Sequence, residues 1–161
     1  LIKIGQYNNK MIIIETINSH AKHGYTIEDI NNGDLRSYKT SYTEKIHLEY
    51  AKLSGDKSKI HTDKLFCKKN GFRDVIGYAF FLNTLFSNIF GMYFPGGTEL
   101  CLRDTSNYRR PFYINDHLLI TIKVININID LQLLTLKKEV RDQSNDLILD
   151  GETVFKLSLV K

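Results

Sequence analysis

The sequence has few of the residues that mark several classes of protein. Among its 161 residues there are two cysteines, two prolines and no tryptophan. Cys67 and Cys101 lie far apart and fit no metal-ligand spacing, which excludes a disulfide framework and a cysteine-based metal site. We expect both to be buried thiols in a reducing, cytosolic compartment. With two prolines and ten glycines, the chain has no low-complexity linker.

The charge is only slightly biased towards one sign. Lysine and arginine number 22 against 18 acidic residues, a net charge of +4. The lysines are scattered and acidic residues interrupt them, so the pattern argues against a nucleic-acid partner, although it is compatible with an anionic ligand. Apolar residues make up 42% and charged residues 25% of the chain. These values predict a single globular domain with a sizeable core.

One uncharged run, residues 75–94, has the length of about 20 residues that a helix needs to cross a bilayer. On a helix, four of its polar residues would form a stripe about 140° wide, and no second hydrophobic segment exists to cover that stripe. The four are Asn83, Thr84, Ser87 and Asn88. We therefore expect no membrane span, but a long central helix that is buried by a sheet.

The N-terminal part carries weaker signals. The apolar run at residues 11–14 is too short for the core of a signal peptide. We expect residues 1–24 to be an N-terminal extension, with residues 1–10 upstream of a native start at Met11. Residues 25–161 are then expected to form one domain.

The first half of the chain predicts a strand followed by helices. Residues 35–42 predict the strand, and Thr43 is placed to cap a helix that Gly55 ends. A polar, turn-like stretch follows. Thr62 is then placed to cap a short helix over residues 63–69 that ends at Asn70–Gly71.

The second half predicts antiparallel strands joined by tight turns. The strands are expected at residues 98–104, 118–129, 131–140 and 153–159, with turns at Asp130 and Asn145–Asp146. The alternation of apolar residues changes phase between Val124 and Ile125, which predicts a bulge or strong bend there. Together the two halves predict an α+β domain, in which about five strands curve around one long helix.

Asp56 and His61 are the pair best placed for acid–base chemistry. On a helix, side chains five residues apart point about 140° away from each other. Between a helix that ends at Gly55 and one that begins at Thr62, however, they share a loop that can turn both inward. A carboxylate and an imidazole that meet at one water can remove and return a proton near neutral pH. The alternative is that Asp56 caps local backbone and His61 is a loop histidine without a chemical role.

The segment around this pair resembles a motif of a known family. From Tyr50 to Asp63 it has an aromatic residue, a few apolar positions, Ser-Gly-Asp, a spacer and Ile-His-Thr-Asp. This is similar to the hydratase motif of the MaoC-like (R)-specific enoyl-CoA hydratases, which have the hot-dog fold. The similarity covers about residues 25–160. Its further elements are residues 25–34, Gly71–Phe72, residues 75–91, Pro95–Gly96 and the turn at 110–116.

The resemblance implies a long helix wrapped by an antiparallel sheet, working as a homodimer or higher homo-oligomer. It implies hydration of an enoyl thioester, or the reverse dehydration, without a metal ion or redox cofactor, on an acyl group carried by coenzyme A or a carrier protein. Asp56 and His61 fall on the family's catalytic residues, and Ser87 falls on a serine of the central helix that lies in the site. The backbone N–H of Ala79 would polarise the thioester oxygen.

The chain departs from the family at two places. Ser58 and Lys59 stand where the family usually has Asn-Pro, and Tyr78 and Ala79 stand where it has His-Gly. The first change loosens the loop that aims the histidine, and the second places a tyrosine and a methyl group beside the substrate. Both changes point away from an ordinary fatty-acyl substrate. We assign four residues to substrate binding: Ser58, Tyr78, Ala79 and Ser87.

Two other functions fit the same fold. Thioester hydrolysis would need an acidic residue on the central helix to activate water, and residues 75–94 contain none. The other is a non-catalytic module that binds an acyl group or only mediates dimer contacts.

Several other polar residues have two interpretations. Lys57 and Lys59 would either attract the phosphates of coenzyme A or an acidic carrier protein, or form a solvated basic loop. Arg109 and Arg110 would either meet a pantetheine phosphate or form ion pairs in a turn. The histidines outside the motif have no partner spacing and are expected at the surface or in turns: His20, His23, His47 and His117.

Overall fold

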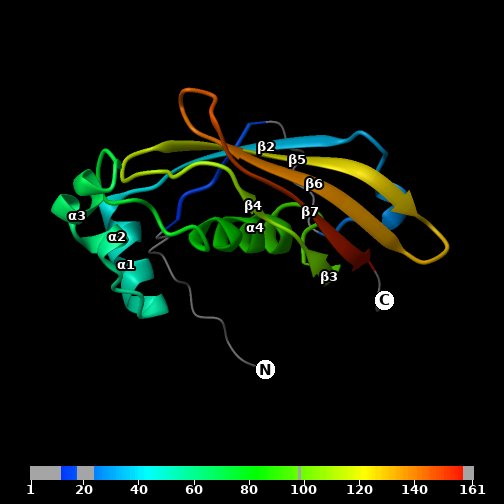
Figure 1. The fold of residues 1–161 in the computed structure, drawn as a ribbon. Helices are drawn as coiled ribbons and strands as arrows, with labels where there is room; N and C mark the ends of the chain where they lie inside the picture. Colours follow the sequence, from blue (N-terminus) through cyan, green and yellow to red (C-terminus); the bar gives the residue numbers. More distant parts are fainter. Residues whose placement is uncertain (1–11, 18–23, 98, 158–161) are drawn as a thin grey trace.

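The computed structural model describes residues 12–17, 24–97 and 99–157, which form one antiparallel sheet and several helices (Figure 1). The strands are β1 (Glu15–Thr16), β2 (Leu35–Ser41), β3 (Glu99–Asp104), β4 (Asn107–Tyr108), β5 (His117–Asn128), β6 (Leu133–Arg141) and β7 (Leu147–Leu157). The helices are the 3₁₀ turn η1 (Ile27–Asp29), α1 (Glu44–Ser54), α2 (Lys59–Thr62), α3 (Lys64–Lys69) and α4 (Phe81–Met92). The order of strands in the sheet is β1-β2-β5-β6-β7-β3, and β4 pairs with β7. The prediction of an α+β domain is confirmed, with seven strands where about five were expected.

The helix α4 lies along one face of the sheet, and α1, α2 and α3 gather at one end of the molecule (Figure 1). The side chains that β5 turns towards α4 are buried: Leu118, Ile120, Ile122 and Val124. They share one hydrophobic cluster with Leu82, Leu85 and Ile89 of α4. Because burying each such side chain contributes about 1.5–3 kcal/mol, the sheet and the helix stabilise each other. This is the arrangement of helix and sheet that the sequence predicts.

The first helix begins and ends where the sequence predicts. The Thr43 hydroxyl accepts a hydrogen bond from the backbone N–H of Ile46 at 3.3 Å, and Gly55 ends α1 with a φ of 73°. The next prediction is wrong. Asp63, not Thr62, caps α3, and its carboxylate accepts from the N–H of Phe66 at 2.9 Å. Thr62 is instead the last residue of the one-turn helix α2, and its hydroxyl donates to the Ser58 carbonyl at 3.0 Å.

The central helix is shorter than predicted, because residues 75–80 are not helical. Ile76 forms an isolated β-bridge with Tyr113, and the N–H of Gly77 donates to the Phe112 carbonyl at 2.6 Å. A Cβ at position 77 would overlap the Phe112 ring, so glycine is required for this close approach. These contacts hold the segment extended until a turn that starts at Tyr78 leads into α4.

The predicted bulge in the long strand is confirmed. The register of β5 against β6 shifts between Val124 and Asn126, the place where the apolar alternation changes phase. Strand β7 begins at Leu147, six residues before the predicted start. The alternation was misleading there, because the neighbours Ile148 and Leu149 are both buried and the register against β6 shifts between Leu147 and Leu149.

The two cysteines differ from each other. Cys67 is buried as expected, but Cys101 is exposed on the edge strand β3, so that part of the prediction is wrong; both are free thiols.

Among the described residues, no helix is long and apolar enough to cross a membrane. Glu15 and Thr16, which lie in the predicted N-terminal extension, pair with β2. The domain boundary stays a prediction, and residues 1–10 lie outside the described residues.

Candidate active site

Asp56 and His61 lie close to each other at the end of the molecule where α1 to α3 gather. His61 Nε2 is 3.7 Å from Asp56 Oδ2. Asp56 follows Gly55 in the loop after α1, whereas His61 lies in α2 and not in a loop as expected. The side chain of His61 is 11% exposed and that of Asp56 is 45% exposed. A shielded imidazole therefore faces a carboxylate that is open to solvent.

Two contacts fix the orientation of the His61 ring. Its Nδ1 lies 2.9 Å from the carbonyl oxygen of Ile76. Because a carbonyl only accepts hydrogen bonds, Nδ1 must carry the proton, and in the neutral ring Nε2 is then the basic nitrogen that faces Asp56. The second contact is with Tyr78, whose ring stacks on the imidazole with centroids 4.0 Å apart. The Tyr78 hydroxyl also donates to the backbone carbonyl of Asp56 at 2.9 Å, so one tyrosine holds both partners.

Ser58 stabilises the negative charge of the Asp56 carboxylate. The backbone N–H of Ser58 donates to Asp56 Oδ1 at 2.9 Å. This bond, together with the Ser58 hydroxyl and the nearby His61, holds the pKa of the Asp56 carboxyl below its usual range. Ser58, one of the residues assigned to substrate binding, therefore contacts the candidate catalytic carboxylate directly.

His47 belongs to this site, although it was expected at the surface. It is only 4% exposed. Its Nε2–H donates to the His61 carbonyl at 2.9 Å, and its Nδ1 accepts from the Tyr42 hydroxyl at 3.0 Å. Burial lowers the pKa of His47, which favours this neutral form. The sequence held a signal, because His47 lies next to Ile46 and one turn after Thr43, on the inward face of an amphipathic helix.

The other histidines have ordinary surroundings or cannot be placed. His117 Nδ1 lies 2.8 Å from the Ser41 hydroxyl, at the exposed start of β5. His20 and His23 lie outside the described residues.

Ala79 lies in the turn that leads into α4. The first bonds of this turn run from the N–H groups of Phe81 and Leu82 to the carbonyls of Tyr78 and Ala79. Among the described residues, the N–H of Ala79 has no hydrogen-bond acceptor. Such free donors are typical of the N-terminal end of a helix. Ala79 follows Tyr78, so this donor lies one residue from the ring that stacks on His61.

Ser87 is placed apart from the pair. It is exposed and lines a hollow of about 360 Å³ between α4 and the edge of the sheet, together with Asn83, Asp104 and Lys138. Asp56 and His61 do not line this hollow. Within one chain, therefore, the structure brings Asp56, Ser58, His61 and Tyr78 together. Ala79 follows Tyr78 in the chain, and Ser87 lies farther along in α4.

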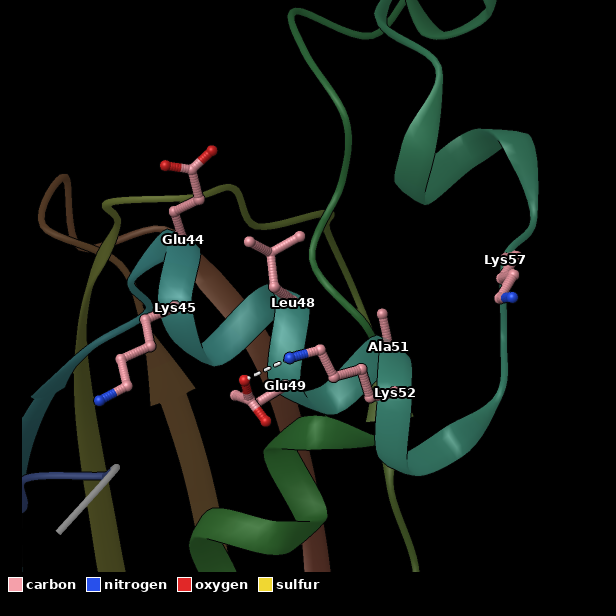
Figure 2. Close-up of a pocket in the computed structure, with 7 residues that line it drawn as sticks. All are labelled: Glu44, Lys45, Leu48, Glu49, Ala51, Lys52 and Lys57. Atoms are coloured by element: carbon pink, nitrogen blue, oxygen red, sulfur yellow. Dashed lines mark hydrogen bonds and ion pairs between the residues drawn. The ribbon is translucent and has the colours of Figure 1, made fainter. Parts of the chain in front are cut away.

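Two adjoining hollows flank α1. One of about 430 Å³ is lined by His47, His61 and Tyr78, and one of about 500 Å³ lies along the outer face of the helix. They share Glu44, Leu48 and Ala51 as lining residues. Figure 2 shows the outer hollow, with Lys57 on the loop opposite Ala51 and Lys52. Lys52 forms an ion pair with Glu49 at 2.8 Å.

Arg109 and Arg110 form ion pairs, one of the two arrangements expected. Arg109 pairs with Asp150, and Arg110 Nη1 lies 2.9 Å from Asp146 Oδ2. Within the described part of the chain, no three His, Cys, Asp or Glu residues gather so that they could hold a metal ion.

Known proteins similar to this chain carry out chemistry of one kind. No family model matches the sequence. The chain is 28% identical to the (R)-specific enoyl-CoA hydratase of Aeromonas caviae over 108 residues, 67% of this chain and 81% of the relative. It is 23% identical to the 3-hydroxybutyryl-CoA dehydratase of Methylorubrum extorquens over 135 residues, 81% of this chain and 82% of the relative.

Solved structures agree on the fold. That of the (R)-hydratase from A. caviae matches with a TM-score of 0.76 and 24% identity, over 81% of this chain and 99% of that chain. A MaoC-like dehydratase matches with a TM-score of 0.75 and 17% identity, over 86% of this chain and 44% of that chain. The predicted hot-dog fold and the predicted family resemblance are confirmed.

Proposed function

Since this chain is related to the (R)-specific enoyl-CoA hydratases and the MaoC-like dehydratases, we propose that it is a hydro-lyase for enoyl thioesters. It adds water to the double bond next to the thioester carbonyl, or removes water in the reverse direction. The observation that carries this proposal is the basic Nε2 of His61 facing the Asp56 carboxylate at 3.7 Å, with Nδ1 bound to a carbonyl.

Asp56 and His61 share one water molecule in this mechanism. A separation of 3.7 Å is too long for a direct hydrogen bond, but a water that contacts both groups can lie beside them. As the water oxygen bonds to the β-carbon, one water proton passes to the pair. The pair then delivers a proton to the α-carbon, so that H and OH are added and the enzyme returns to its starting state.

The Ala79 amide stabilises the charge that develops on the thioester oxygen. When water adds to the β-carbon, the electrons of the double bond move towards the carbonyl and form an enolate. A free N–H at the beginning of a helix favours that negative charge, both by hydrogen bonding and through the helix dipole. The free donor in the turn before α4 supports this role.

The carrier of the acyl group is coenzyme A or a carrier protein. Lys57 lines the hollow along α1, which adjoins the one lined by His61. A cation there, with Lys59 two residues before His61, would attract the phosphates of either carrier. The location proposed for the protein is the cytosol.

We propose that the protein functions as a homodimer. Within the part of the chain that the structure describes, the edge strand β3 pairs with β7 alone. It exposes Leu100 and Leu102, at 56% and 52%. A second copy would cover these apolar side chains and the free edge. Light scattering on the purified protein is expected to give twice the chain mass, and a monomer would contradict this arrangement.

The test offers the protein an enoyl-CoA and the saturated acyl-CoA of the same length. We expect loss of the enoyl absorbance and formation of the 3-hydroxyacyl product, with no release of free thiol from either compound. Asp56→Ala and His61→Ala should each reduce kcat by about 10²–10⁴-fold, whereas the matched controls Asp130→Ala and His117→Ala should not. Thiol release from both compounds would indicate a thioesterase. Binding without turnover over a panel of enoyl thioesters would indicate a non-catalytic module.

A further inference from the structure

A lysine occupies a core position of the sheet. Along β6 the residues that face α4 alternate regularly, and three of the four are apolar: Leu134, Leu136, Lys138 and Val140. The side chain of Lys138 has no exposed surface. Lysine is almost never fully buried unless it is paired.

The partner of Lys138 is Asp104, at the end of β3. The ammonium Nζ lies 2.5 and 2.7 Å from the two carboxylate oxygens, and 4.5 Å from the centre of the Phe86 ring. Thr153 donates a further hydrogen bond to Asp104 at 2.6 Å. Gly151 lies opposite Lys138 in the register, and a Cβ there would overlap the Thr105 carbonyl and also lie 3.2 Å from the lysine Cε.

Stability does not explain this pair, since a buried ion pair is often no more stabilising than apolar residues of similar volume. Burial lowers the pKa of Lys138, and the bond to Asp104 opposes that shift. The pair also differs from a sealed core contact, because the side chain of Asp104 is 34% exposed. It borders the hollow of about 360 Å³ that Ser87 lines. A carboxylate held by a buried cation is therefore presented to a cavity.

Hydrogen bonds connect α4 with the Asp104 carboxylate at this cavity. Asn83, which lines the cavity, lies four residues after Ala79, about one helical turn. Its side-chain amide donates to the Tyr108 hydroxyl at 3.2 Å and accepts from Ser106 at 3.1 Å. Ser106 in turn approaches Asp104 at 3.4 Å. The cavity thus includes a residue about one helical turn beyond the proposed oxygen-binding amide, and hydrogen bonds from Asn83 through Ser106 lead to Asp104.

We propose that this cavity receives the far end of the acyl chain, and that the Lys138–Asp104 pair selects chains that carry a hydrogen-bond donor there, such as a hydroxyl group. The proposal rests on the hydratase function proposed above. An unsubstituted alkyl end would take water away from the Asp104 carboxylate without replacing its hydrogen bond, which disfavours binding. A hydroxyl group would donate to the carboxylate and replace that water. The departures at Ser58–Lys59 and Tyr78–Ala79 also pointed away from an ordinary fatty-acyl substrate.

The test compares pairs of enoyl-CoA substrates that differ only in a hydroxyl group on the last carbon, over a series of chain lengths. At the length that reaches Asp104, kcat/KM is expected to be at least about tenfold higher for the hydroxylated compound. A short unsubstituted enoyl-CoA, which does not reach the cavity, is assayed beside them. If the short compound is turned over but no chain length shows a preference for the hydroxyl group, the inference is wrong and the proposed function stands. If no enoyl thioester is turned over, both are wrong.

Variants then test whether the pair itself is responsible. The double substitution Asp104→Leu with Lys138→Met removes both charges, and we expect it to abolish the preference for the hydroxylated substrate. The control is Lys137→Met on the opposite face of the same strand, where Lys137 is exposed and pairs with Glu139; this variant should keep the preference. Should the double variant not fold, Asp104→Asn, which keeps the shape of the side chain but not its charge, is expected to reduce the preference. A preference that survives in a folded double variant, or in Asp104→Asn when the double variant does not fold, would overturn the assignment.

Discussion

The two polar sites of this molecule are built in different ways. Asp56 and His61 are five residues apart in the chain, and the loop and turn between two helices bring them together. Asp104 and Lys138 come from different strands, and only the pairing of β3 and β6 with β7 places them in contact. The first site is open to solvent at its carboxylate, whereas the second has its cation fully buried. A reactive pair can thus be positioned by the local conformation of the chain, whereas a buried ion pair in the core depends on strands that are far apart in the sequence.

The largest expected effect concerns the solvent-exposed pair, Asp56 and His61. If Asp56 and His61 handle one water molecule together, the double variant Asp56→Ala/His61→Ala should lose no more activity than the more damaged single variant, about 10²–10⁴-fold in kcat. Steady-state kinetics on one enoyl-CoA measures all three proteins. Independent, multiplying losses would contradict a shared water.

The buried pair should respond in stability. Asp104→Ala leaves the Lys138 ammonium in the core without its partner, and we expect it to lower the free energy of unfolding by about 3–5 kcal/mol. Removing both charges with Asp104→Leu and Lys138→Met should cost much less, because no unpaired buried charge remains. Denaturant titrations measure these differences, with Lys137→Met as the surface control. Equal losses for the single and double changes would mean that the charges do not interact.

His47 should connect structure and activity at the open site. His47→Phe keeps the ring volume but leaves the His61 carbonyl and the Tyr42 hydroxyl without their partner, which should cost about 1–3 kcal/mol of stability. Because His47 acts through α2 as a positioning residue, kcat should fall with little change in KM. His47→Gln, which retains an N–H donor, should restore part of kcat. A fall in stability with unchanged kcat would leave His47 with a structural role alone.

The smallest effect is a change in pH dependence. The N–H of Ser58 lowers the pKa of Asp56, so removing it raises that pKa, and the carboxylate is then lost at a higher pH as the solution is acidified. Ser58→Pro removes both the N–H and the hydroxyl, and its φ of −58° is compatible with proline. We expect the acidic limb of the kcat/KM profile to move to higher pH. Ser58→Ala keeps the N–H and should move it less, so a larger shift in Ser58→Ala would be inconsistent with this account.

The sequence predicted those features that depend on short-range signals. Thr43 and Gly55 marked the ends of α1, and the phase change at Val124–Ile125 marked the bulge of β5, since capping and alternation are local. The Asp56–His61 pair was found in the same way, through its spacing and the resemblance of its surroundings. The roles assigned to both residues, and to Ser87, stay predictions.

The features that were missed depend on tertiary contacts. Residues 75–80 were expected to be helical because they are apolar, but pairing of Ile76 and Gly77 with the segment at 112–113 keeps the first part extended and a turn follows. His47 was expected at the surface, because nothing in its immediate neighbours shows that His61 and Tyr42 lie on either side of it. Lys138 was not predicted to be buried, although it continues a row of inward-facing apolar residues in β6.

The most direct measurement of the central claim is the fate of water oxygen. The protein is incubated with an enoyl-CoA in water enriched in heavy oxygen, and the products are analysed by mass spectrometry. The account predicts heavy oxygen in the hydroxyl group on the β-carbon of an intact thioester, formed about 10²–10⁴-fold more slowly with His61→Ala. Heavy oxygen in a released carboxylate, or labelled thioester at the wild-type rate with His61→Ala, would contradict it.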